Sequence, residues 1–152
     1  MSQEIDVFLA DLENYFNNLK PADLASLDNY YASDACFKDP FNDVMGCAHI
    51  KAIFEHMFKT LESPRFTVTQ RLYDSEKAFM CWDFSFSPKS APRQIFVIKG
   101  STYLSFCKDA QGNFKINVHR DYWDPAQEIY EKIPLLGSLF KWIRKQSSAP
   151  LS

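Results

Sequence analysis

The amino-acid sequence predicts an α+β fold, a cone-like roll in which three N-terminal helices pack on a curved, mostly antiparallel sheet. Apolar residues recur at helical spacing over most of the first 61 residues, and after Pro64 they recur at every second residue over four long segments. Helices that precede a run of strands, rather than alternating with them, are typical of α+β domains. The 152 residues suit one domain with a substantial core.

Three helices are expected before the sheet. The stretch "KPADLASLDNYY", with Pro21 in its first turn, predicts the second helix, and "CAHIKAIFEHMFKTLES", which follows Gly46 and ends at Ser63-Pro64, predicts the third. A short strand, "ACFKDPF", is expected between them and ends at Pro40. The first helix carries one apolar stripe, made of Ile5, Phe8, Leu12, Tyr15, Phe16 and Leu19.

Four longer strands follow, and each shows the period of two that a sheet requires. They are "RFTVTQRLYD", "KAFMCWDFSF", "RQIFVIKGSTYLSF" and "NFKINVHRDYW", and the turn "DAQG" joins the last two. In the second of them, Met80, Trp82, Phe84 and Phe86 share one strongly aromatic face. Periodicity leaves open whether that face lines a cavity or a dimer interface.

The C-terminal segment differs from the rest of the chain. We expect a cone domain over residues 1–125, an amphipathic helical extension over 126–146 and a disordered tail over 147–152. Pro134 and Gly137 are expected to break the extension into two pieces, and Lys141, Arg144 and Lys145 give it a basic end. The extension is expected to cover the sheet or a partner subunit; the alternative is contact with a membrane surface, without stable insertion.

Composition argues against several classes of protein. The net charge is −2 and the charges are scattered, so no nucleic-acid partner is expected. The four widely spaced cysteines are expected to be free, buried thiols in a reducing cytoplasm. The acidic N-terminus is not typical of a signal peptide, and no segment approaches a membrane span. His49 and His56 have no partner at ligand spacing, so neither a metal nor a cofactor is expected.

The phrase "YASDACFKDP" at residues 31–40, a glycine opening the next helix and the order of elements together resemble the nuclear transport factor 2-like superfamily. Within it, residues 3–125 look most similar to the ketosteroid isomerase and SnoaL-like polyketide cyclase group. This resemblance implies a conical cavity and a homodimer formed through the outer face of the sheet. It also implies that Asp39 occupies the position of a general base and Tyr15 that of an oxyanion donor. The second oxyanion donor of ketosteroid isomerases is replaced here by Thr102, so plain steroid isomerisation is not expected.

The candidate catalytic residues are Asp39, His119, Asp121 and Tyr15. On a strand, His119, Asp121 and Trp123 share one face, and a His two residues from an Asp can form a hydrogen-bonded acid–base pair. Each assignment has a structural alternative: Asp39 as a turn residue, Tyr15 as a core residue, and the His–Asp pair as a brace for the last strand. The candidate substrate-binding residues are Tyr31, Phe54, Thr102 and Trp123.

Two functions remain open from the sequence. One is a cofactor-free isomerase, cyclase or hydratase-like enzyme that uses Asp39 as general base on a small apolar, cyclic substrate. The other is a non-catalytic ligand-binding or protein-interaction domain of the same fold. A closed apolar cavity of roughly 300 Å3 surrounded by Asp39, His119 and Tyr15 would favour the enzyme. A cavity filled by Phe and Trp side chains would favour the alternative.

Overall fold

The computed structural model describes residues 2–130 and 136–147. The chain divides into two compact units, Met1–Tyr122 and Trp123–Ser152, and each is described by itself. The predicted break at Pro134 and most of the predicted disordered tail lie outside the described residues.

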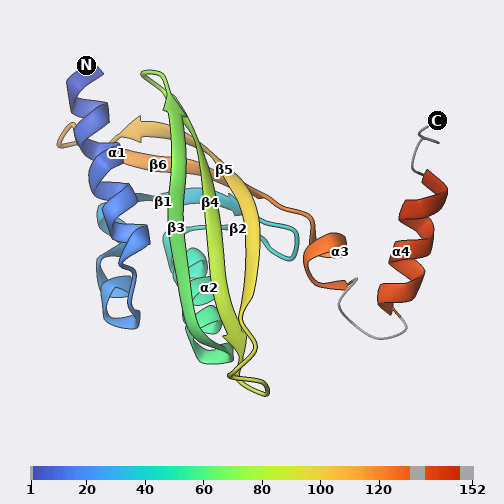
Figure 1. Ribbon diagram of the computed structural model, residues 1–152. Coiled ribbons are helices and arrows are strands. Elements are labelled where there is room, and N and C mark those ends of the chain that lie inside the picture. Colours follow the sequence, from blue (N-terminus) through green and yellow to red (C-terminus); the bar gives the residue numbers. More distant parts are fainter. Residues whose placement is uncertain (1, 131–135, 148–152) are drawn as a thin grey trace. The chain divides into compact units, whose positions relative to one another are not determined.

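The first unit contains one mixed, unclosed sheet of six strands in the order β2-β1-β6-β5-β4-β3. β1 pairs antiparallel with β2 but parallel with β6, and the other neighbours are antiparallel. Figure 1 shows how the long strands curve. The α+β class predicted from the sequence is therefore confirmed. The strands are β1 (Tyr31–Lys38), β2 (Asp43–Met45), β3 (Leu61–Tyr73), β4 (Lys77–Pro88), β5 (Phe96–Lys108) and β6 (Phe114–Tyr122).

Three helices accompany the sheet: α1 (Ser2–Asn17), the 3-10 helix η1 (Pro21–Asn29) and α2 (Cys47–Thr60). The predicted second helix is thus a 3-10 helix that ends before Tyr31. Its first turn is held by the Asp23 carboxylate, which accepts a hydrogen bond from the Lys20 backbone N–H. Tyr31 instead begins β1, where it pairs with Ile116 of β6. The short strand β2 was not predicted.

The core lies between the helices and the inner face of the sheet. Alternate residues of the strands point to this face, so helical and strand periodicities meet in one apolar cluster. Burial of each large aliphatic side chain contributes about 1.5–3 kcal/mol. The apolar cluster includes Ile5, Leu9 and Leu12 of α1, Ile50 and Phe54 of α2, and Ala78, Met80, Leu104 and Ile116 of the sheet.

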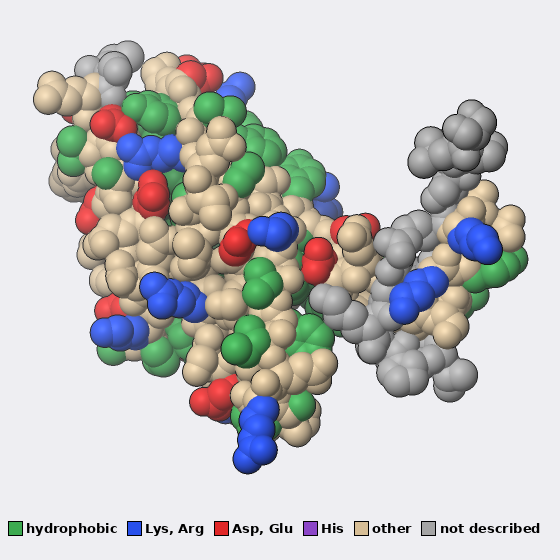
Figure 2. All heavy atoms as spheres, viewed as in Figure 1, with side chains coloured by type: hydrophobic (Ala, Val, Ile, Leu, Met, Phe, Trp, Pro, Cys, Tyr) green, Lys and Arg blue, Asp and Glu red, His purple; other side chains and the backbone are tan. Residues whose placement is uncertain are grey.

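The outer face of the sheet keeps several large apolar side chains exposed. Leu72 is 66% exposed and Phe79 42%, and Tyr122 stacks on Phe79. Figure 2 shows hydrophobic side chains of the first unit lying among charged ones on the surface. All four cysteines are free, as predicted, but Cys36 and Cys81 are exposed rather than buried because they alternate with inward-pointing residues.

The second unit contains two described helices, α3 (Pro125–Glu128) and α4 (Leu136–Ser147). Asp124 caps α3, because its carboxylate accepts hydrogen bonds from the backbone N–H groups of Ala126 and Gln127. Among the described residues, no helix has the length and apolar character that crossing a bilayer requires.

Candidate functional site

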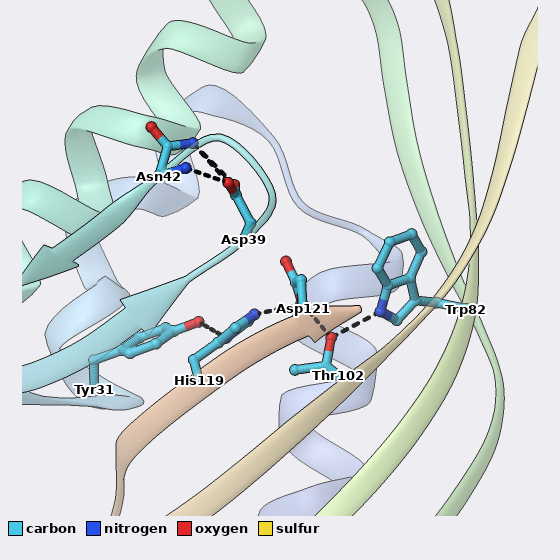
Figure 3. Close-up of polar contacts among 7 residues, drawn as sticks. All are labelled: Tyr31, Asp39, Asn42, Trp82, Thr102, His119 and Asp121. Carbon is cyan, nitrogen blue, oxygen red and sulfur yellow. Dashed lines mark hydrogen bonds and ion pairs between the residues drawn. The ribbon is translucent and has the colours of Figure 1, made fainter. Parts of the chain in front are cut away.

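A line of polar side chains crosses the inner face of the sheet on β4, β5 and β6. Register explains why they meet: Thr102 lies directly opposite Asp121, and His119 lies opposite Leu104, two residues further along β5. Residues two apart on a strand point to the same face. Thr102, His119 and Asp121 therefore converge on one patch of an otherwise apolar surface, beside Trp82 of β4 (Figure 3).

Four hydrogen bonds join these side chains into one network. The Trp82 Nε1–H donates to Thr102 Oγ1 over 2.7 Å, and the Thr102 hydroxyl donates to Asp121 Oδ1 over 2.5 Å. His119 Nε2 lies 2.8 Å from the same Asp121 oxygen. The other ring nitrogen of His119, Nδ1, lies 2.7 Å from the Tyr31 hydroxyl. Asp121 Oδ1 is thus fixed from two sides.

The network also fixes the protons. Burial, and then the nearby Asp121 carboxylate, raise the pKa of Tyr31 well above its ordinary value, so its hydroxyl stays protonated. In the His119 tautomer whose Nε2–H donates to Asp121, the Tyr31 hydroxyl donates to Nδ1. The proton on a neutral His119 is then on Nε2, from where it is donated to Asp121. Both ring nitrogens of His119 and the single hydroxyl proton of Thr102 are therefore engaged within the protein.

Asp121 keeps one oxygen outside this network. Within the described residues, the hydrogen bonds to its carboxyl group end on Oδ1. Figure 3 shows the other oxygen pointing away from Thr102 and His119. The Asp121 side chain is 17% exposed, whereas that of His119 is 6% exposed. Asp121 is consequently the member of the network with an oxygen available to a bound molecule.

A small apolar cavity adjoins this network. Its volume is about 40 Å3, enough for about three water molecules and well below the several hundred Å3 of a drug-sized site. Four of its lining side chains are Phe or Trp, so a ring-sized ligand requires some of them to rotate. By the criterion set from the sequence, a cavity this small favours the non-catalytic alternative. The lining residues are Phe16, Phe54, Phe66, Val68, Met80, Trp82, Thr102, Leu104, His119 and Asp121.

The place of Trp82 depends on a glycine. Trp82 pairs with Gly100 across β4 and β5, and a Cβ added at Gly100 would lie 2.3 Å from Cη2 of the indole. The ring therefore occupies the space that a side chain at position 100 would fill, and its Nε1 reaches Thr102. Trp82 shares its face with the buried Met80, so the aromatic face of this strand, left open by the sequence, points into the core.

Asp39 lies outside the lining of the cavity. Its Oδ1 accepts hydrogen bonds from the backbone N–H groups of Phe41 and Asn42, and both oxygens accept from the Asn42 side-chain amide. This is the geometry of a side chain that closes the turn between β1 and β2. Figure 3 shows Asp39 facing Asn42.

Tyr15 is also absent from the lining. Its hydroxyl donates to the Asp23 backbone carbonyl over 2.9 Å, which ties α1 to the 3-10 helix η1. Of the three residues that the sequence led us to expect around one cavity, His119 lines this cavity and Asp39 and Tyr15 do not. Trp123 falls in the second unit, outside the part of the chain that holds the cavity.

The other predicted site residues lie in or next to the cavity. Phe54 and Thr102 line it, and Tyr31 lies behind it as the partner of His119. Sequence reasoning missed Phe16 and Phe66 as lining residues, although both fall on apolar stripes. Within residues 2–130 and 136–147, His, Cys, Asp and Glu side chains form no group of three that could hold a metal ion.

Solved structures of similar fold carry several names. A SnoaL-like polyketide cyclase, so named for Shewanella denitrificans, is 21% identical, with a TM-score of 0.62 over 82% of this chain and 93% of that chain. A protein of ketosteroid isomerase-like fold from Catenulispora acidiphila, solved in complex with trimethylamine, is 16% identical, with a TM-score of 0.63 over 80% of this chain and 88% of that chain.

A third structure, named as a scytalone dehydratase of Novosphingobium aromaticivorans, is 14% identical, with a TM-score of 0.62 over 81% of this chain and 83% of that chain. At these identities the likeness shows the fold alone. No curated protein sequence matches this chain significantly. The SnoaL-like domain model, however, matches residues 12–111, well over half of the chain, and the chain therefore belongs to the SnoaL-like domain family.

Proposed function

We propose that this protein binds a small, mainly apolar molecule beside Asp121 and carries out cofactor-free acid–base chemistry on it. The observation that carries the proposal is a carboxylate with one oxygen fixed by Thr102 and His119 and the other left outside the network, at the edge of an aromatic cavity. A general base needs such a fixed and partly shielded carboxylate. Asp121 takes the role that the sequence led us to expect of Asp39.

The residues around Asp121 suit a proton transfer. Asp121 would remove a proton from a carbon next to a carbonyl group, or from a hydroxyl group, and return it at another position. His119 and Thr102 position the carboxylate and donate no hydrogen bond to the substrate, because their donors are already engaged. In isomerisation the proton returns to another carbon, and in loss of water it passes to the departing hydroxyl group, so the same carboxyl group acts first as base and then as acid. The names of the structural neighbours, a polyketide cyclase and a scytalone dehydratase, are compatible with that range.

The test measures proton exchange directly, so it does not require the natural substrate. Small cyclic ketones are incubated with the protein in D2O, and exchange of the hydrogens next to the carbonyl group is followed by NMR. We expect Asp121→Asn, which keeps an acceptor oxygen for Thr102 and His119, to lower the exchange rate by at least about 100-fold. Asp39→Asn is the matched control and leaves the rate unchanged. An exchange rate that survives Asp121→Asn refutes the proposal.

The size of the cavity favours a second candidate, non-catalytic binding of a small organic cation. About 40 Å3 accepts a molecule of a few heavy atoms without rearrangement, and aromatic rings with a nearby carboxylate attract alkylammonium groups. The neighbour from Catenulispora acidiphila was solved with a molecule of this size, trimethylamine. Calorimetric binding of trimethylammonium that is lost in Asp121→Asn, with no ketone exchange in the unmodified protein, would select this candidate.

A further inference from the structure

We propose that α4 docks on the surface of an anionic lipid bilayer and lies parallel to it, with its apolar face in the headgroup region. The proposal concerns only the second unit and does not depend on the chemistry of the cavity. It rests on three features of α4, sequence LGSLFKWIRKQS: an exposed apolar face, a one-sided charge and a short length.

The apolar face is made of Leu139, Trp142 and Ile143. Their spacing of three and four residues places them within about 100° of the helix circumference. They are 50%, 59% and 43% exposed, respectively. Large apolar side chains that are exposed together, rather than singly, mark a surface that binds something.

The charge of α4 differs from that of the chain. Its sequence has no Asp or Glu, whereas the whole chain carries a net charge of −2. Lys141 and Lys145, one turn apart, are both exposed, and the helical spacing places Lys141 nearly opposite Leu139. Figure 2 shows cationic and hydrophobic side chains on different sides of α4. A basic face opposite an apolar face that contains Trp is the pattern of helices that lie in a membrane interface.

An anionic lipid surface fits these features better than α4 of a second copy of this chain. An anionic bilayer offers negative headgroups to the lysines, an apolar region to Leu139 and Ile143, and the interfacial depth that Trp side chains favour. Twelve residues extend about 18 Å, too short to cross the hydrocarbon core, so the helix lies on the membrane. Pairing of α4 with α4 of a second copy would bring like charges together.

The test is flotation of the full chain with vesicles of phosphatidylcholine alone or mixed with phosphatidylglycerol. We expect binding to the mixed vesicles, weaker binding to phosphatidylcholine, and a decrease as salt is added. Ile143→Asp should weaken binding by at least about tenfold. The same substitution at another exposed isoleucine, Ile95→Asp, is the matched control and should change nothing. Replacing Lys141 or Lys145 by Gln should weaken binding roughly fivefold each, only with anionic lipid.

A spectroscopic measurement on the folded protein makes the test independent of destabilised variants. Mixed vesicles should shift the Trp fluorescence to shorter wavelength, and Trp142→Phe, which keeps an apolar ring on the face, should bind equally well without that shift. Two results overturn the proposal. One is a lack of binding to phosphatidylglycerol vesicles at low salt. The other is conversion of a dimer to a monomer by Ile143→Asp in sedimentation velocity, which would make a second copy the occupant of this face.

Discussion

At the scale of single residues, Asp39 shows how the same local sequence supports two interpretations. The resemblance pointed to a general base, while Asp before Pro pointed to a turn, and the hydrogen bonds to Phe41 and Asn42 agree with the turn. Asp39→Ala should lower the free energy of unfolding by about 2 kcal/mol, because it removes a charged acceptor of two backbone donors. Asp39→Asn should cost less, since it keeps an acceptor oxygen. Urea denaturation measures both, and equal losses would contradict this role.

Thr102 joins two other members of the polar network, Trp82 and Asp121. Thr102→Val keeps the shape of the side chain but leaves the Trp82 N–H without its acceptor and removes one donor from Asp121. We expect a loss of about 1–3 kcal/mol in the free energy of unfolding, the cost of leaving a buried polar group unpaired. Thr102→Ser retains the hydroxyl and is the control. If the Val variant is as stable as the Ser variant, the network contributes little to stability.

The site was predictable from the sequence where it depends on residues close together in one strand. His119 and Asp121 are two apart on a strand, so their shared face follows from the period of two. The contact of Trp82 with Thr102 depends on the register between β4 and β5, which no local pattern fixes. The engagement of Tyr31 with His119 likewise depends on a parallel pairing of β1 with β6.

At the scale of elements, the long strands were predictable and the short ones were not. β3 to β6 have nine or more residues each, enough for alternation to be recognised. β2 has three residues, none of them buried, and exists because it pairs with β1 beyond the Asp39 turn. Helical spacing placed Tyr31 in the second helix, but Tyr31 begins β1. Its pairing with β6 outweighs the helical pattern of the local sequence.

The close approach of β4 and β5 at Gly100 gives an element-scale prediction. Gly100→Ala places a Cβ within contact distance of the Trp82 ring and should displace it, at a cost of about 1–3 kcal/mol in the free energy of unfolding. The Trp fluorescence of the folded state should change as well. Ser101→Ala, at the next position on the opposite face of the strand, is the control. Unchanged fluorescence in Gly100→Ala would show that the ring does not need the glycine.

At the scale of the whole molecule, the outer face of the sheet leads us to expect a homodimer. Leu72 and Phe79 are register partners on β3 and β4, and Phe79 stacks with Tyr122, so these side chains form one exposed apolar area. Sedimentation velocity should show a dimer that Phe79→Lys converts to a monomer. Ile95→Lys, at an exposed loop position, is the control and should leave the dimer intact. A monomeric unmodified protein would exclude this interface.

The buried phenols predict how the fold as a whole responds to alkali. Burial, and then Asp23, raise the pKa of Tyr15 to about 12, and the pKa of Tyr31 is raised well above its ordinary value. In the unfolded chain these groups ionise near pH 10, so above that pH the unfolded state releases protons that the folded state retains. Stability should therefore be insensitive to these two groups below about pH 10 and should fall as the pH rises further.

Urea midpoints measured across this range should show a smaller decrease in Tyr15→Phe than in the unmodified protein. Since that variant also loses the hydrogen bond to the Asp23 carbonyl, its stability starts lower at neutral pH, and only the slope against pH is diagnostic. Equal slopes would mean that Tyr15 ionises alike in both states.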